Sequence, residues 1–165
     1  MDVRPAPFDH PDAVKLNDEV QLEYVERYSA DGGSEGDATP LDASMFQPPR
    51  GLFLIAYDDQ DRPVATGGWR SQEKNDHGYS DGDAELKRMY VIPEARGLGL
   101  ARRILAVLEE DAKAAGRTRM VLETGIRQPE AIALYLSVGY LPCAKFGHYR
   151  EYENSRCYAR PLSRP

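Results

Sequence analysis

Hydrophobic positions along the chain follow two different periods, and these predict a fold that mixes strands with helices. The apolar runs at residues 52–57 and 64–69 flank a turn rich in Asp and Pro, which predicts a β-hairpin. Residues 85–91 predict a further strand, but its alternation of apolar and polar positions is imperfect. A single bulge near Arg88 or Met89 would restore that alternation.

Three segments carry the spacing of amphipathic helices. Residues 11–27 have an imperfect apolar stripe, and residues 98–115 repeat apolar side chains at helical intervals. Gly116 follows the second segment at the position where a helix is commonly terminated. A third helix is expected to begin at Pro129 and to end at Gly139.

Shorter strands complete the predicted order of elements. We expect strands around Val3, at residues 119–124, from Tyr140 onward and at residues 156–160. The resulting order is β, α, three strands, α, β, α and two strands. Hairpins dominate the first half and helices follow strands in the second, which predicts a mixed sheet with helices on its faces.

Two long segments show no periodicity and are rich in Gly and Asp. They are residues 29–40 and 71–83, and both are predicted to be loops. Loops of this length are commonly part of a functional site or lack a fixed conformation.

Composition and charge limit the classes of function. The 165 residues fit one domain spanning 1–165, and a net charge of −6 disfavours nucleic acid and anionic membranes as partners. The chain has neither an apolar run long enough to span a membrane nor an apolar leader, so a cytoplasmic location is expected. Two cysteines and three widely spaced histidines predict neither a disulfide framework nor a metal site.

Residues 91–101 contain the most informative local pattern. A strand ends, a turn with Gly97 and Gly99 follows, and a helix begins directly. Several backbone N–H groups converge at such a junction and the helix dipole favours negative charge there, so the pattern predicts a phosphate site. Arg96 adds a positive charge. The pattern is neither a P-loop, which needs Gly-Lys-Ser/Thr, nor the dinucleotide fingerprint, whose third glycine is replaced by Arg102.

The chain resembles the GNAT superfamily of acyl-CoA-dependent N-acetyltransferases through two signatures in the right order. Arg96-Gly-Leu-Gly99-Leu-Ala101 matches the family's Arg/Gln-x-x-Gly-x-Gly/Ala loop. Ala131-Ile-Ala-Leu-Tyr135-Leu-Ser-Val-Gly139-Tyr140 matches its second signature. The resemblance is strongest over residues 83–141.

This resemblance implies an α/β fold of the GNAT type. Its sheet is mixed and mostly antiparallel, has six to seven strands flanked by helices, and has splayed fourth and fifth strands. Acetyl-CoA is then the co-substrate, without a metal. The residues implied to bind it are Met89, Tyr90, Val91, Arg96, Gly97, Leu98, Gly99, Leu100, Ala101 and Gln128. Gln128 departs from the Asn that the family often carries at its position, so its reach toward the cofactor differs.

The resemblance also implies catalytic roles. Tyr135 occupies the position of a general acid for the leaving thiolate, and Glu85 that of a general base. Glu123 and ordered water are the alternatives to Glu85.

The acceptor is expected to be a primary amine on a small molecule. Acidic residues in the two long loops favour a cationic one. A protein or peptide acceptor and a non-catalytic acyl-CoA-binding module are the alternative functions. A homodimer formed through the C-terminal strands would fit the family.

Overall fold

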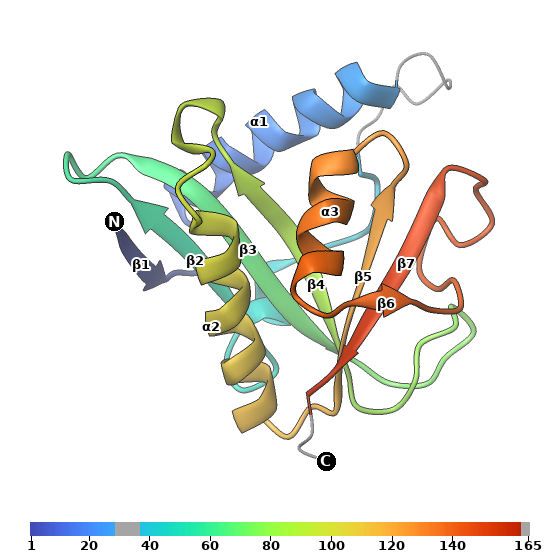
Figure 1. Ribbon diagram of the computed structural model, residues 1–165. Coiled ribbons are helices and arrows are strands. Elements are labelled where there is room, and N and C mark those ends of the chain that lie inside the picture. Colours follow the sequence, from blue (N-terminus) through green and yellow to red (C-terminus); the bar gives the residue numbers. More distant parts are fainter. Residues whose placement is uncertain (29–36, 163–165) are drawn as a thin grey trace.

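A central sheet with helices on both faces organises the computed structural model, which describes residues 1–28 and 37–162 (Figure 1). The strands are β1 (Asp2–Pro5), β2 (Gly51–Tyr57), β3 (Pro63–Gln72), β4 (Asp83–Val91), β5 (Arg119–Gly125), β6 (Leu141–Pro142) and β7 (Ser155–Pro161). The helices are α1 (Pro11–Tyr28), α2 (Leu100–Ala114) and α3 (Pro129–Ser137), with short 3₁₀ turns η2 (Ala43–Phe46) and η3 (Pro93–Ala95).

The described strands form one seven-stranded sheet in the order β1-β2-β3-β4-β5-β7-β6. Every neighbouring pair is antiparallel except β4 and β5, which are parallel. The mixed, mostly antiparallel sheet predicted from the sequence is therefore confirmed.

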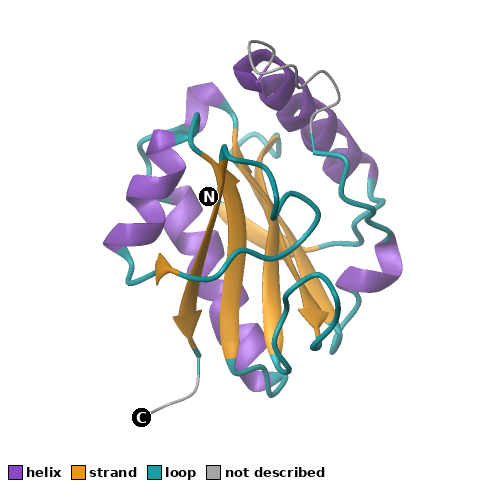
Figure 2. Ribbon diagram, turned by 90° about the vertical axis from the view of Figure 1, so that its right-hand side faces the viewer, coloured by secondary structure: helices purple, strands orange, loops and turns teal. Residues whose placement is uncertain are grey.

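The two faces of the sheet are covered by different helices. Figure 2 shows α1 on one side of the sheet and α2 and α3 on the other. Leu16 and Val20 of α1 are buried, as are Ile104 and Leu108 of α2. Trp69 of β3 is completely buried, and its indole N–H donates to the Asp111 carboxylate of α2 at 2.9 Å. The core thus consists of two layers separated by the sheet.

A β-bulge interrupts β4 at Arg88. The register shifts there, because Gly68 pairs with Lys87 whereas Thr66 pairs with Tyr90. Arg88 has a φ of 57°, a left-handed conformation that is uncommon for a residue with a side chain. The Thr66 hydroxyl donates to the Arg88 carbonyl at 2.9 Å and holds the bulge from the neighbouring strand. The bulge predicted near Arg88 or Met89 is therefore present.

The strands β4 and β5 separate soon after they meet. Their pairing joins Asp83–Glu85 to Arg119–Val121 and goes no further along the described residues. The edge of β4 that faces β5 is therefore without a ladder partner from Leu86 onward. These are the splayed fourth and fifth strands expected from the family.

Several boundaries differ from the sequence-based predictions. Helix α2 begins at Leu100 and not at residue 98, because Gly97 and Gly99 have φ values of 83° and 78° that no right-handed helix accepts. Tyr140 does not begin a strand, because its N–H donates to the Tyr135 carbonyl at 3.0 Å and continues the end of α3. The strand that follows has only two residues.

The predicted loop at residues 29–40 lies partly outside the described residues, which resume at residue 37. Residues 37–42 have no regular structure and lead into η2. None of the described helices combines the length and apolar character that crossing a membrane requires.

Replacing Thr66 by Val tests whether β3 holds the bulge. The substitution keeps the buried shape but removes the hydrogen bond to the Arg88 carbonyl, so the free energy of unfolding should fall by about 1–2 kcal/mol. Urea denaturation measures this. Thr118→Val is the matched control, because the exposed Thr118 hydroxyl also donates to a carbonyl, that of Gly82. Equal losses in both variants would contradict the role of Thr66.

Candidate functional site

The turn before α2 presents backbone donors without acceptors of their own. The first hydrogen bond of the helix runs from the Arg103 N–H to the Gly99 carbonyl at 3.1 Å, and no side chain caps Gly99. The positions that a Cβ would take on Gly97 and Gly99 are open, since within the described residues no atom beyond the adjoining backbone lies within 4 Å. This segment, predicted to bind pyrophosphate, therefore fits an anion approaching its backbone closely.

Arg96 fixes this turn to its surroundings. Its Nε donates to the Val91 carbonyl at 2.9 Å, and its Nη2 contacts a Glu23 carboxylate oxygen of α1 at 2.8 Å. The guanidinium stays partly exposed beside the turn. Arg96 thus connects the end of β4, the turn and α1, and its contact with the cofactor stays a prediction.

The open edge of β4 carries the residues predicted to pair with the pantetheine arm. The Met89 sulfur lies beside Gly67 and Ile104 on the α2 side of the sheet. Tyr90 is buried, and its hydroxyl lies 3.5 Å from a Glu19 carboxylate oxygen on the α1 side. Side chains therefore occupy both faces of β4, while its backbone edge faces the splay between the strands.

Gln128 is already engaged by α1. It precedes α3, and its side-chain amide donates to the Tyr28 hydroxyl at 3.3 Å. The contact predicted between Gln128 and the cofactor stays a prediction.

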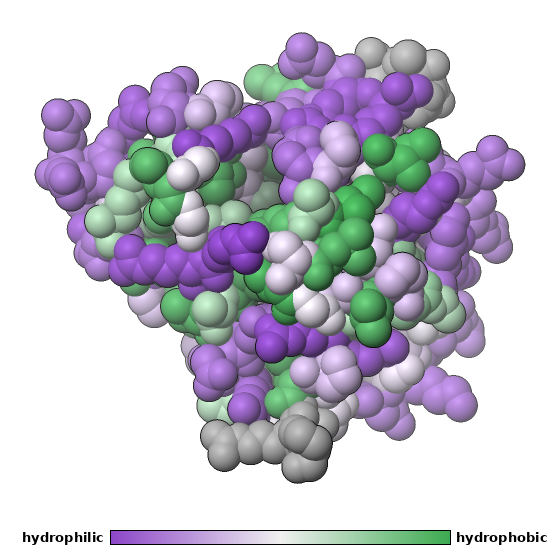
Figure 3. All heavy atoms as spheres, viewed as in Figure 1, coloured by the Kyte–Doolittle hydropathy of each residue, from purple (hydrophilic) through white to green (hydrophobic). Residues whose placement is uncertain are grey.

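Tyr135 lies on the inner side of α3. Its ring packs edge-on against Tyr140 with the centroids 5.7 Å apart, and 6% of the residue is exposed. Burial raises the pKa of the Tyr135 phenol, so the hydroxyl keeps its proton over the physiological range. The opposite side of α3 is apolar where Leu136 is exposed, and Figure 3 shows apolar side chains gathered over this helix.

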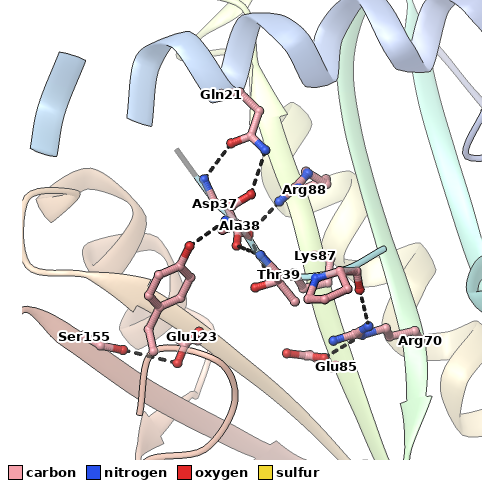
Figure 4. A network of polar contacts seen from close by, with 12 residues as sticks. Gln21, Asp37, Ala38, Thr39, Arg70, Glu85, Lys87, Arg88, Glu123 and Ser155 are labelled. Atoms are coloured by element: carbon pink, nitrogen blue, oxygen red, sulfur yellow. Dashed lines mark hydrogen bonds and ion pairs between the residues drawn. The ribbon is translucent and has the colours of Figure 1, made fainter. Parts of the chain in front are cut away.

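Six ionisable side chains meet on the α1 side of the sheet, and we call them the charged cluster (Figure 4). They come from the segment before η2, from β3, from β4 and from β5. The members are Asp37, Arg70, Glu85, Lys87, Arg88 and Glu123.

Glu85 is fully used in structural contacts. One carboxylate oxygen accepts from Arg70 Nε at 2.7 Å and from Gln72 Nε2 at 3.1 Å. The other accepts from the Tyr79 hydroxyl at 2.8 Å. With 1% of the residue exposed and three donors in place, Glu85 is held as the partner of a buried arginine.

Asp37 joins two cations of β4. One of its carboxylate oxygens contacts Lys87 Nζ at 3.0 Å and Arg88 Nη1 at 2.6 Å. Gln21 of α1 holds the Asp37 backbone through hydrogen bonds to both its N–H and its carbonyl. Burial opposes the charge of Asp37, but Lys87 and Arg88 outweigh it and keep the pKa of the carboxyl well below its usual range.

Glu123 binds a proton more strongly than a carboxyl in water does. Burial raises its pKa to about 7, Glu85 and Asp37 add to the rise, and Lys87 opposes it. The Ser155 hydroxyl of β7 donates a hydrogen bond to the Glu123 carboxylate at 3.3 Å. Gly147 lies against the same carboxylate, since a Cβ there would be 3.4 Å from an oxygen. A group that titrates near neutral pH suits proton transfer.

The cluster includes residues that the sequence analysis did not select. Arg70, Lys87 and Arg88 were missed, although charged residues within a strand that is otherwise apolar are a signal for a buried polar site. Asp37 was grouped with acidic loop residues that favour a cationic acceptor. In the structure, Asp37 is paired with cations, and Asp83 is paired with Arg119 at 2.8 Å. Asp31 and Glu35 lie outside the described residues, so the expectation of a cationic acceptor stays untested.

Comparison with known proteins identifies the family. Residues 15–140 match the model of the acetyltransferase (GNAT) family. The IAA acetyltransferase of Azospirillum brasilense is 42% identical over 144 residues, which cover 87% of this chain and 90% of that protein. The uncharacterized N-acetyltransferase YjgM of Escherichia coli is 30% identical over 135 residues, covering 80% and 76% of the two chains.

Solved structures agree with this match. A Klebsiella pneumoniae chain assigned as an acyl-CoA N-acyltransferase superposes with a TM-score of 0.77 at 26% identity, covering 98% of this chain and 97% of that one. An aminoglycoside 6′-N-acetyltransferase in complex with coenzyme A has a TM-score of 0.69 at 17% identity over 100% and 99% of the chains, a likeness of fold alone. The chain belongs to the GNAT family of acetyltransferases, which use acetyl-CoA as the donor.

Proposed function

We propose that this protein transfers the acetyl group of acetyl-CoA to a primary amine of a small molecule, with Glu123 as the general base and Tyr135 as the general acid. The protein acts as one domain spanning residues 1–165. The observation that carries the proposal is the open edge of β4, which runs from the charged cluster to the uncapped start of α2. Acetyl-CoA lying along this edge would have its phosphates at the start of α2 and its acetyl group beside the charged cluster.

Donor binding uses backbone groups. The N–H and carbonyl groups of Met89 and Val91 pair with the pantetheine amides as an added strand would. The amides from Gly97 to Ala101 hold the pyrophosphate, and Arg96 adds its charge at the rim.

Glu123 removes the proton that the attacking amine must lose. The amine nitrogen then forms a bond to the thioester carbonyl carbon, and a backbone N–H of the bulged part of β4 stabilises the resulting oxyanion. Glu123 is preferred to Glu85, although the sequence favoured Glu85, because Arg70, Gln72 and Tyr79 already occupy the Glu85 carboxylate.

Tyr135 completes the transfer. When the tetrahedral intermediate collapses, the carbon–sulfur bond breaks and the phenol gives its proton to the departing sulfur. The raised pKa of Tyr135 keeps that proton available.

A small-molecule acceptor is supported by the names of related proteins, because one relative is called an IAA acetyltransferase and one structural neighbour an aminoglycoside acetyltransferase. Calorimetric titration with coenzyme A, followed by thiol release from acetyl-CoA with a panel of primary amines, tests the proposal. Donor binding and amine-dependent release are expected. A folded protein that does not bind coenzyme A would contradict it.

Replacing Glu123 by Gln should lower kcat about 100-fold or more, because the amine loses its base. In the unchanged protein kcat/KM should rise with pH through about 7, as Glu123 ionises, and this rise should disappear in the variant. Rate measurements from pH 5.5 to 8.5 check both effects. A raised pKa also means that ionising Glu123 opposes folding, and this cost grows from about pH 4.5 to about pH 7. The stability that the variant gains relative to the unchanged protein should therefore increase over this range and level off above it.

Glu85→Gln is the matched control for that experiment. It leaves the buried Arg70 without its carboxylate, so the free energy of unfolding should fall by about 3 kcal/mol, while the pH-dependent rise in rate remains. Loss of the rise in Glu85→Gln and its survival in Glu123→Gln would assign the base to Glu85.

Replacing Tyr135 by Phe should lower kcat about 100-fold with little change in affinity for coenzyme A, because only the proton donor is removed. Steady-state kinetics measure kcat, and calorimetric titration measures the affinity for coenzyme A. Tyr140→Phe is the control, since its hydroxyl contacts Glu109 at 2.7 Å, so that variant should lose stability and keep its turnover. Full turnover of Tyr135→Phe would remove Tyr135 from the reaction.

A further inference from the structure

The β4 bulge brings two cations to the same face of the sheet. Consecutive residues of a regular strand point to opposite faces, so Lys87 and Arg88 would normally diverge. The left-handed backbone of Arg88 breaks this alternation, and both side chains reach the same oxygen of Asp37. Their side chains are 7% and 6% exposed. Two cations held this close and this deeply repel each other unless anions compensate them.

The charged cluster has three cations and three carboxylates, so it is one negative charge short whenever Glu123 is protonated. Arg70, Lys87 and Arg88 carry three positive charges, and Asp37 and Glu85 carry two negative ones. Glu123 is the only other cluster member, and with a pKa of about 7 it is protonated part of the time near neutral pH. A ligand with one negative charge would balance the cluster when Glu123 holds a proton.

The charge of the acceptor also affects the cost of binding beside the charged cluster. A simple amine arrives as an ammonium ion and would add a positive charge beside Lys87 and Arg88. An acceptor that also carries a carboxylate arrives with no net charge, so it avoids that burial cost.

A hydroxyl next to the two cations is poorly satisfied. Thr39 is 9% exposed, and its side-chain oxygen makes no well-formed hydrogen bond within residues 1–28 and 37–162, although it lies close enough to the Asp37 carboxylate to help lower the pKa of that group. Its backbone N–H donates to the other carboxylate oxygen of Asp37 at 3.0 Å, which places the residue beside the cation pair. A buried hydroxyl without a well-formed hydrogen bond is costly, and a ligand oxygen would satisfy it.

We infer that the acceptor is an amino acid or a similar small molecule with a carboxylate close to its amine, and that Lys87 and Arg88 recognise this carboxylate with the Thr39 hydroxyl. The inference rests on the proposed function, since it names the substrate class of the same site. A monoanionic carboxylate fits better than a phosphate because the charge deficit is a single unit. Asp37 holds the two cations together when no substrate is bound.

Matched acceptors test the inference. The twenty common amino acids and their carboxamides are compared by thiol release from acetyl-CoA. For the best acceptor, kcat/KM should favour the carboxylate over the carboxamide about tenfold to hundredfold, as expected for hydrogen bonds to a charged group. Lys87→Gln and Arg88→Gly should each reduce this ratio to about one. Each variant leaves Asp37 one cation, and glycine accepts the φ of position 88.

Arg160→Gln is the control variant, because it removes a cation that is paired with Glu109 outside the cluster and should keep the ratio. Equal or better transfer to the carboxamides would overturn the inference and leave the proposed function standing. Transfer to other primary amines but to no member of this panel would also overturn the inference alone, whereas binding of coenzyme A without transfer to any primary amine would overturn both.

Discussion

The left-handed backbone at Arg88 is the constraint on which the rest of the site depends. It shifts the register between β3 and β4, and the Thr66 hydroxyl on β3 holds its carbonyl. A bulge bends its strand, and beyond the first residues of β4 the backbone edge toward β5 is open, where the donor is proposed to bind. The bulge also places Lys87 and Arg88 on one face, where the acceptor is proposed to lie. One strained residue thus connects the two halves of the proposed reaction.

Buried charge shapes the acceptor side. Glu85 and Asp37 are held by cations and stabilise the structure of the site. In contrast, burial raises the pKa of Glu123 to about 7. Pairs of carboxylates in contrasting environments commonly divide structural and proton-transfer roles in this way.

The sequence predicted most of the fold because local patterns there agree with the tertiary structure. The Gly97–Gly99 turn, the bulge in β4 and the ends of α2 and α3 all have chemical signals in the chain. It did not predict that Asp37 would reach Lys87, since the two are fifty residues apart and no local pattern records the contact. It ranked Glu85 above Glu123 as the base for the same reason, because the donors that occupy Glu85 come from β3 and from the loop that carries Tyr79.

Hydrogen exchange of the backbone amides, measured with and without coenzyme A, tests the central claim most directly. If the open edge of β4 and the start of α2 bind the donor, the amides of Met89 and Val91 and those from Gly97 to Ala101 should exchange more slowly in the complex. The β1–β2 pair, on the far side of the sheet, should be unchanged. Slower exchange elsewhere, with β4 and the turn unaffected, would contradict the account.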